Sequence, residues 1–288
     1  NCGMLAAGAI GAAVSGFLAG WSMSSEPNTS PNPDAPRRPR GIYLLPNLFT
    51  TGGLFAGFYA IIAAASGDFA SAAIAVFVAG LLDGLDGRVA RMTNTQSEFG
   101  VQYDSLADLV SFGMAPALVM YHWSLSHLKV YGPLWGKLGW TVAFLYAACA
   151  ALRLARFNTQ VGIVDKRYFI GLASPAAAAS LMAFVWLFNE LGFTGVDLEY
   201  ITPVLTATAA LLMVSRIRYN SFKTLPWGDR VPFVTVIIAL GVFAALAVAP
   251  SRVLLAIAWV YAASGPATWL WQRFRPRTDD APPSAPAA

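Results

Sequence analysis

Charged residues are scarce in this 288-residue chain: Asp, Glu, Lys and Arg make up 12% of it, against roughly 25% in soluble proteins. Hydrophobic residues make up 57%, and several uncharged stretches are long enough to cross a bilayer. This composition excludes a disordered chain, a coiled coil and an ordinary soluble enzyme. We therefore expect an all-α polytopic membrane protein embedded in a lipid bilayer.

Cysteine is also rare, with only Cys2 and Cys149 far apart in the sequence. Two such residues can build neither a disulfide framework nor a thiolate metal site. The net charge of +4 on so apolar a chain is better explained by membrane orientation than by nucleic acid. We expect no nucleic-acid partner.

Uncharged intervals predict about eight transmembrane helices, since roughly 20 residues cross the hydrocarbon. The second helix carries acidic residues towards its end, and the third carries them at its beginning. The predicted spans are about 43–65, 69 to just beyond Asp83, 99–122, 136–157, 169–189, 199–216, 231–250 and 252–272. Pro175 is expected to relieve or kink the fifth of these helices.

Lysine and arginine are distributed very unevenly over this layout. Of the 19 such residues, only Lys129, Lys137 and Arg252 fall on the side opposite the amino-terminal head. Because basic residues favour the cytoplasmic side, we expect both ends of the chain there, and the paired acidic residues with them. An acidic loop with Glu190, Asp197 and Glu199 is then expected to be solvated on the outside.

The two ends of the chain have different compositions from the spans. Residues 1–42 combine an extra apolar segment with a proline-rich head that we interpret as flexible. We interpret Met23 as the biological start, with an additional membrane helix before it as the alternative. Residues 273–288 are expected to form a disordered cytoplasmic tail.

Four aspartates at the predicted inner surface are the most informative feature. Asp83 and Asp86 are spaced i,i+3, and Asp104 and Asp108 are spaced i,i+4, so each pair shares one helix face. A short turn joins the two helices and brings the pairs towards each other. Four carboxylates in partly apolar surroundings are costly unless compensated.

Two divalent cations would supply that compensation, and oxygen ligands suit Mg²⁺ or Mn²⁺. Gly84 and Gly87 remove side chains where a ligand would approach. Arg91 lies one turn beyond Gly87 and is suited to a phosphate group. The alternative is a solvated corner in which the aspartates pair with nearby arginines.

The complete pattern resembles the signature of the CDP-alcohol phosphotransferase family. Its matching positions are Asp83, Asp86, Gly87, Ala90, Arg91, Gly100, Asp104 and Asp108. The resemblance implies transfer of a substituted phosphate from a CDP-linked donor to an alcohol, with release of CMP. It also implies a two-metal centre held by all four aspartates, with Asp108 as general base.

The resemblance further implies a six-helix catalytic core over residues 43–216, with residues 217–272 forming two additional helices. By the same resemblance, Asn47, Thr50, Gly87, Arg91 and Ser97 contact the donor, and Gly84 leaves space for it. Judged from the sequence alone, Asn47 and Thr50 also suit helix capping. Homodimerisation is an expectation from the family.

The acceptor is indicated by residues beyond the signature. Leu109 stands where glycerol-phosphate users have a lysine, and three segments resemble the membrane-embedded bacterial subgroup that uses serine. These segments are Asp108–Ala117, Arg153–Asn158 and Gly171–Ala178. Arg153 and Arg156 share a helix face and suit the carboxylate of L-serine, although positive-inside anchoring also explains them.

The sequence therefore predicts a metal-dependent enzyme of a bacterial inner membrane, with its active site facing the cytoplasm. It would make phosphatidylserine and CMP from CDP-diacylglycerol and L-serine. Inositol phosphate, glycerol phosphate or choline remain alternative acceptors. An ion-coupled transporter with an aspartate cation site is the alternative from another class.

Overall fold

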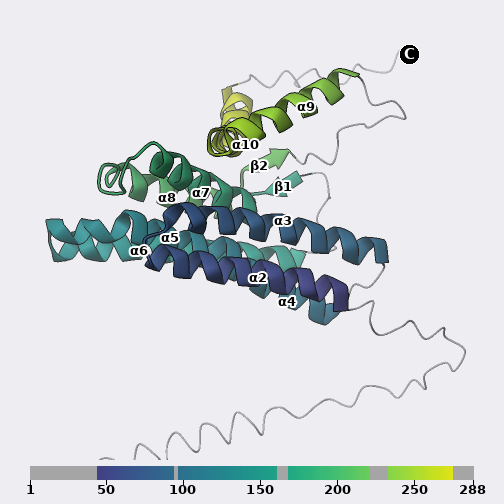
Figure 1. Cartoon of the computed structure of the whole chain (residues 1–288), viewed down its shortest axis with the longest axis horizontal. Helices are drawn as coiled ribbons and strands as arrows, with labels where there is room; N and C mark the ends of the chain where they lie inside the picture. Colours follow the sequence, from purple (N-terminus) through teal and green to yellow (C-terminus); the bar gives the residue numbers. More distant parts are fainter. Residues whose placement is uncertain (1–43, 94–96, 161–167, 221–232, 275–288) are drawn as a thin grey trace, which may run out of the picture. The chain divides into compact units, whose positions relative to one another are not determined.

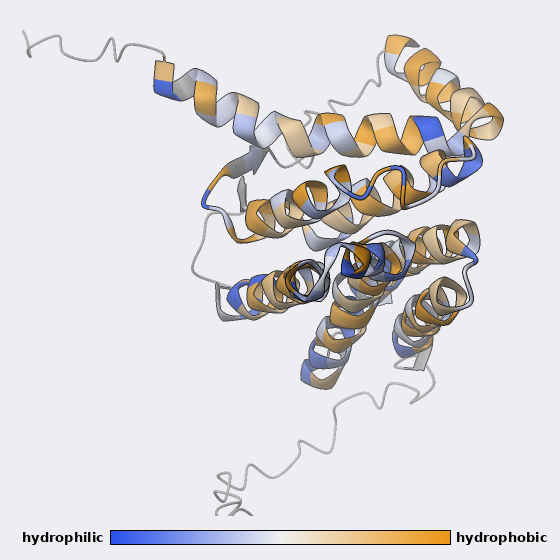
Figure 2. Cartoon of the chain, turned by 90° about the vertical axis from the view of Figure 1, so that its left-hand side faces the viewer, coloured by the Kyte–Doolittle hydropathy of each residue, from blue (hydrophilic) through white to orange (hydrophobic). Residues whose placement is uncertain are grey.

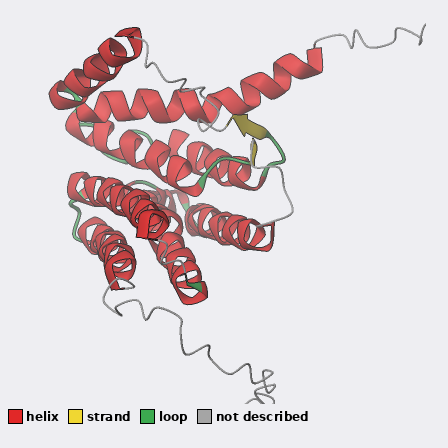
Figure 3. Cartoon of the chain, turned by 90° about the vertical axis from the view of Figure 1, so that its right-hand side faces the viewer, coloured by secondary structure: helices red, strands yellow, loops and turns green. Residues whose placement is uncertain are grey.

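A computed structural model describes residues 44–93, 97–160, 168–220 and 233–274, and most of these are helical (Figures 1 and 3). The α-helices are α2 (Leu44–Ala65), α3 (Phe69–Thr93), α4 (Glu98–Asp108), α5 (Ala115–Trp123), α6 (Pro133–Gln160), α7 (Ser174–Glu190), α8 (Ile201–Val214), α9 (Phe233–Val248) and α10 (Pro250–Phe274). A π-helix, η2 (Leu109–Met114), joins α4 to α5, and a 3₁₀ helix, η3 (Leu125–Tyr131), follows α5.

The predicted all-α membrane fold is confirmed, because each predicted span corresponds to a helical segment. Among the described residues, four helices are long and apolar enough to cross a membrane: α2, α3, α6 and α10. Helices α8 and α9 are shorter but also apolar. Figure 2 shows hydrophobic residues along most of the helices, and many large apolar side chains are exposed, as lipid contact requires.

Two predicted details of the fifth span are wrong. The helix α7 begins at Ser174 rather than at 169, and Pro175 lies in its first turn, where proline is well tolerated. Pro175 therefore does not kink α7. The residues before α7 belong instead to a short antiparallel pair that the sequence did not predict, formed by β1 (Tyr168–Ile170) and β2 (Arg218–Asn220).

Gly171 ends β1 in a conformation that favours glycine, with φ +81°. A Cβ atom here would lie 2.3 Å from the carbonyl oxygen of Met213. The Gly171 N–H donates to the carbonyl of Ile217 at 2.8 Å. This close approach joins the start of α7 to the end of α8.

Helices α2 and α3 run side by side (Figure 1). Their buried residues are mainly alanines: Ala56, Ala60, Ala63 and Ala64 on α2, and Ala72, Ala73, Ala75 and Ala79 on α3. Small side chains let the two backbones approach closely, which is how helices associate in lipid. This packing places the amino-terminal half of α2 beside the acidic end of α3.

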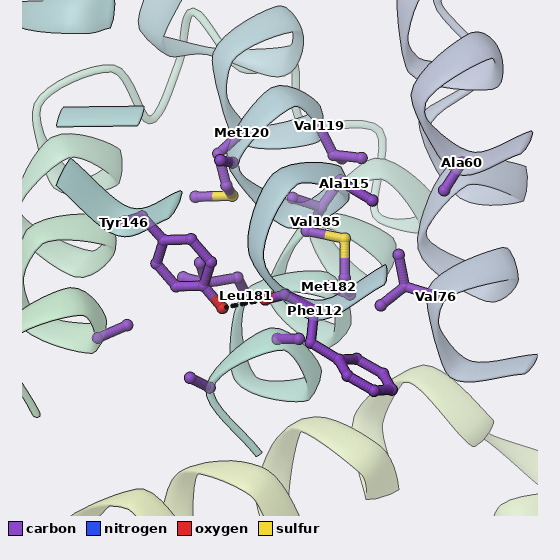
Figure 4. Close-up of a cluster of buried hydrophobic side chains, with 14 of the residues drawn as sticks. Ala60, Val76, Phe112, Ala115, Val119, Met120, Tyr146, Leu181, Met182 and Val185 are labelled. Atoms are coloured by element: carbon purple, nitrogen blue, oxygen red, sulfur yellow. Dashed lines mark hydrogen bonds between the residues drawn. The ribbon is translucent and has the colours of Figure 1, made fainter. Parts of the chain in front are cut away.

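The third predicted span is interrupted by η2, directly after Asp108. A π-helix disturbs the regular backbone hydrogen bonding, and such segments are frequent at functional sites. The fully buried Tyr146 of α6 donates its hydroxyl to the carbonyl of Phe112 in η2 at 3.2 Å (Figure 4). Tyr146 thus ties the segment that follows Asp108 to α6.

Helix α10 packs along α7. The indole N–H of Trp259 donates to the carbonyl of Ser180 at 3.4 Å, and its ring stacks on Phe184 with centroids 6.0 Å apart. The division into a core at 43–216 and an addition at 217–272 stays a prediction. The predictions for residues 1–42, for Met23 as the start and for the tail beyond Phe274 fall outside the described residues.

The acidic loop after α7 is not uniformly solvated, so that expectation is wrong for Glu199. Its side chain is only 5% exposed and accepts a hydrogen bond from the Tyr131 hydroxyl, which raises the pKa of that tyrosine. Asp197 accepts hydrogen bonds from the backbone and side chain of Thr194. These bonds lower the pKa of Asp197.

Candidate active site

Three of the four aspartates converge where α3 and α4 lie together. Carboxylate oxygens of Asp83, Asp104 and Asp108 lie within 4.8 Å of one another. The i,i+4 spacing on α4 directs Asp104 and Asp108 to the same side of that helix. All three side chains are half-buried, so they form a compact acidic cluster with limited access to water.

Asp86 joins this cluster from a more enclosed position. Its side chain is 5% exposed, and its Oδ2 accepts a hydrogen bond of 2.9 Å from the Thr50 hydroxyl of α2. It interacts electrostatically with Asp83, Asp104 and Asp108. The structure therefore brings all four predicted aspartates together. Thr50, which lies 36 positions before Asp86 in the chain, orients the Asp86 carboxylate.

The carboxylates line a pocket of about 190 Å³, including the space at its open mouth. Its other walls come from α2, α3, α4 and η2. The lining residues are Thr50, Gly53, Ala79, Asp83, Asp86, Asp104, Ala107, Asp108, Ser111 and Phe112. Apolar walls around grouped carboxylates make these charges costly without a cation.

The donor set fits a hard divalent cation. Such cations take oxygen ligands, and carboxylates are the usual protein ones. A Cβ atom added at Gly84 or at Gly87 would meet no described atom within 4 Å, so the space beside this turn of α3 is open. The three clustered carboxylates are able to hold a metal ion, with room for a further ligand nearby.

Two of the predicted donor-binding residues, Ser97 before α4 and Asn47 of α2, meet beside the first turn of α4. The Ser97 hydroxyl caps this helix by accepting from the Gly100 N–H at 3.0 Å. A Cβ atom at Gly100 would lie 3.1 Å from Ser97 Oγ and 3.6 Å from Asn47 Oδ1. Glycine at position 100 therefore lets the Asn47 and Ser97 side chains approach the same backbone.

Arg91 lies on the exposed side of α3. Its Nε donates to the carbonyl of Gly87, one turn earlier, at 2.8 Å. This bond folds the side chain back along its own helix, over the glycine turn. The guanidinium thus lies next to the open space at Gly87.

Arg153 of α6 interacts electrostatically with the acidic cluster, and the described residues include no salt bridge between them. The Nη1 of Arg153 donates to the Ser174 hydroxyl at 3.0 Å, and its charge interacts with Asp108. Its Nε is buried with no hydrogen-bond partner in the described part of the chain. Arg156 is half-buried one turn later, and the described residues include no salt-bridge partner for it.

The sequence alone did not predict several hydrogen-bonded residues around the site. The hydroxyls of Thr51 and Tyr103 share a hydrogen bond of 2.9 Å across 52 positions, and Asn158 donates to Ser105 Oγ at 3.0 Å across 53 positions. Ser174 belongs to a segment that the sequence singled out, but not as the partner of Arg153. The two partners of each pair are far apart in the sequence, so the spacing of neighbouring residues does not predict these contacts.

A helical membrane fold with a half-buried acidic pocket defines a membrane-embedded enzyme with a candidate metal site. Comparison with known families identifies the family of enzymes to which it belongs. The sequence model of the CDP-alcohol phosphatidyltransferase family matches residues 43–215, which include all four aspartates. The chain belongs to this family.

Several curated relatives share the name CDP-diacylglycerol–serine O-phosphatidyltransferase. The protein of that name from Helicobacter pylori is 38% identical over 230 residues, covering 80% of this chain and 92% of the relative. One from Mycobacterium bovis is 41% identical over 165 residues and 54% of each chain. One from Methanocaldococcus jannaschii is 37% identical over 147 residues, 51% of this chain and 62% of the relative.

Proposed function

We propose that the protein transfers the phosphatidyl group of CDP-diacylglycerol to the hydroxyl of L-serine, giving phosphatidylserine and CMP. One observation carries this proposal: the cluster of Asp83, Asp104 and Asp108 at the pocket of a chain that belongs to the CDP-alcohol phosphatidyltransferase family. The names of its relatives support serine as the acceptor.

The proposed metal centre uses all four aspartates to hold two divalent cations, Mg²⁺ or Mn²⁺. When bound, such ions offset the carboxylate charges and polarise the diphosphate of the donor. Thr50 fixes the orientation of Asp86, as hydrogen-bonded partners commonly do for ligating carboxylates.

The donor is proposed to lie across the ends of α2, α3 and α4. Asn47 and Ser97, which both approach Gly100, would contact its nucleotide part together with Thr50. The turn at Gly84 and Gly87 leaves open space for the diphosphate. Arg91, already folded over Gly87, supplies a cation there.

Asp108 is proposed as the general base. It accepts the proton of the serine hydroxyl while that oxygen forms a bond to the β-phosphorus of the donor. The bond from this phosphorus to the oxygen of CMP breaks at the same time. Arg91 stabilises the charge that develops on the departing CMP.

Arg153 is the better placed of the two arginines to hold the serine carboxylate. It interacts with Asp108, so a serine held by its carboxylate at Arg153 would present its hydroxyl near the base. Arg156 remains a candidate for the same role through its position one turn away on α6. A guanidinium binds a carboxylate through two parallel hydrogen bonds.

CMP release from CDP-diacylglycerol tests the proposal directly. Purified protein in Mn²⁺ or Mg²⁺ is supplied with serine, inositol phosphate, glycerol phosphate or choline in turn, and the lipid product is identified. Serine alone is expected to drive release and yield phosphatidylserine. Release with another acceptor alone would contradict serine as substrate. Cation transport into vesicles without CMP release would favour the transporter alternative.

The cellular setting is also a proposal. The distribution of basic residues supports a bacterial inner membrane protein whose active site faces the cytoplasm. That orientation would give the site direct access to soluble serine. Homodimerisation is proposed from the family and is testable by cross-linking in membranes.

A further inference from the structure

The start of α7 places one buried hydroxyl beside the proposed acceptor arginine. Gly171 forms the tight junction between β1 and α7, and the N–H of Leu172 donates to the carbonyl of Leu212 in α8 at 3.0 Å. Ser174 is the first residue of α7 and is only 1% exposed. The backbone contacts on both sides of this junction therefore determine where the Ser174 hydroxyl lies.

This hydroxyl contacts Arg153 directly. The Nη1 of Arg153 donates to Ser174 Oγ at 3.0 Å, and the bond joins α6 to α7. A hydroxyl is a neutral acceptor, so it holds Nη1 without cancelling the positive charge of the guanidinium. An acidic side chain at position 174 would instead compete with an anionic substrate for the same group.

A second hydrogen bond ties the same end of α6 to another helix. The Nδ2 of Asn158 donates to Ser105 Oγ at 3.0 Å, and Ser105 stands between Asp104 and Asp108 on α4. The last turns of α6, which carry Arg153, are thus tied both to the helix of the proposed base and to α7. Arg153 extends from a backbone that is held on two sides.

The bond to Ser174 leaves a different edge of the guanidinium for a ligand. In arginine the N–H of Nε runs parallel to one N–H of Nη2, and this pair of donors matches the two oxygens of a carboxylate. The Nε of Arg153 is buried and has no hydrogen-bond partner in the described part of the chain. A buried donor without a partner is costly, and a carboxylate on this edge would remove that cost.

We propose that Ser174 is a positioning residue for the acceptor: by holding Nη1, it directs the Nε and Nη2 edge of Arg153 to the serine carboxylate. This inference rests on the proposed transfer to serine and deepens it by naming the edge that binds the substrate. Ser174 acts only through the guanidinium and does not itself touch the substrate.

The substitution Ser174→Ala tests this role, because it removes the hydroxyl and adds no bulk. The KM for serine is expected to rise roughly three- to tenfold, within the range of coupling between contacting residues. The KM for CDP-diacylglycerol and the kcat at saturating serine should stay within about twofold, since only acceptor binding is weakened. An unchanged serine KM, or a loss shared equally by both substrates, would overturn the inference.

Two further variants separate this role from a general effect on packing. Ser180→Ala is the matched control, because this buried hydroxyl of α7 donates to the carbonyl of Ala176 in its own helix at 2.8 Å. It should leave both KM values unchanged. Ser174→Thr retains a hydroxyl and should give a lower serine KM than Ser174→Ala. A threonine variant that matches the alanine variant would count against the hydrogen bond.

The edge itself is tested by the Nε–H resonance of Arg153, measured by NMR in protein with isotope-labelled arginine, Mg²⁺ and CMP. Arg153→Lys identifies this resonance by removing it. L-Serine well above its KM should shift the resonance to lower field, as a new hydrogen bond to a carboxylate does. Ethanolamine, which lacks the carboxylate, should leave it in place. A resonance that serine does not move would refute the assignment of this edge.

Failure of the proposed function has a different signature. Wild-type protein would then release no CMP with serine, whatever residue stands at position 174. If the wild type is active with serine and Ser174→Ala leaves its KM unchanged, only the role of Ser174 is wrong.

Discussion

The four aspartates have different neighbours, and this difference bears on their roles. Asp86 is nearly enclosed and hydrogen-bonded to Thr50, whereas Asp108 interacts with Arg153 on the proposed acceptor side. A carboxylate held rigidly suits metal ligation, and one beside the acceptor suits proton transfer. Substitutions at these two places should therefore have distinguishable effects.

Asp108→Asn is expected to lower turnover at least about a hundredfold, because it removes the proposed base. Binding of CDP-diacylglycerol at saturating Mn²⁺ should be largely retained, as the asparagine keeps the shape of the side chain. CMP release and equilibrium lipid binding measure the two effects. Asp83→Asn and Asp108→Asn should both weaken Mn²⁺ binding, since both residues belong to the proposed metal site, so turnover is compared at saturating Mn²⁺. Substantial turnover by the Asp108 variant would remove this residue as the base.

Thr50→Val is expected to reduce turnover or Mn²⁺ affinity about tenfold, since partners of ligating groups typically contribute a factor of ten to a hundred. The substitution removes the 2.9 Å hydrogen bond to Asp86 and keeps the side-chain volume. Thr206→Val in α8 is a matched control, because the Thr206 hydroxyl donates to the carbonyl of Thr202 in its own helix. Equal effects of both variants would contradict a specific role for Thr50.

At the scale of elements, an irregular segment between α4 and α5 directly follows Asp108. The π-helix η2 begins at the residue after it, and Ser111 in the same segment donates to the carbonyl of Gly53 at 3.1 Å. Tyr146 supports η2 from the other side. The irregular segment that follows Asp108 is thus held between α2 and α6.

Tyr146→Phe should lower the free energy of unfolding by about 1–3 kcal/mol, the cost of leaving a buried hydrogen-bonding group without its partner. It should also reduce kcat, because the Phe112 carbonyl loses its contact with α6 and Asp108 is held less firmly. Thermal unfolding in detergent and CMP release measure these effects. A fully active and equally stable variant would show that η2 needs no such support.

Gly171 and Gly67 form a second comparison, because both have positive φ angles, +81° and +84°. Gly67→Ala should cost only the strain of the left-handed region, about 1–2 kcal/mol, since its Cβ would meet no described atom within 4 Å. Gly171→Ala adds a clash with the Met213 carbonyl at 2.3 Å and should lower the Tm distinctly more. Similar Tm values for the two variants would contradict this tight junction.

For the whole molecule, membrane orientation has the largest consequence, because it decides which compartment supplies serine. The basic residues favour an acidic site on the cytoplasmic side. Val130, between α5 and α6, would then lie outside with Asn189 at the end of α7. Met92, near the end of α3, would lie inside.

Single cysteines test this orientation in a background with Cys2 and Cys149 replaced by alanine. Val130→Cys and Asn189→Cys should react with an impermeant maleimide added to intact cells. Met92→Cys, at a side chain that is 86% exposed in the protein, should react only after the membrane is opened. Labelling of Met92→Cys in intact cells would reverse the proposed orientation.

The sequence by itself determined the helical membrane fold, because apolar runs of bilayer length can satisfy their backbone hydrogen bonds only within helices. It also paired the aspartates, because helical periodicity is local: Asp104 and Asp108 share a face wherever their helix lies. The family signature depends on the same local spacing. These features need no knowledge of which helices pack together.

Only the tertiary structure decided how the parts of the site are held. The bond from Thr50 to Asp86 joins residues 36 positions apart, and the contact of Arg153 with Ser174 spans 21. The packing of α10 against α7 and β2 likewise joins segments that are far apart in the sequence. Each of these contacts joins different elements of the fold. Contacts of this kind are determined by how the helices pack, and the periodicity of a single segment does not predict them.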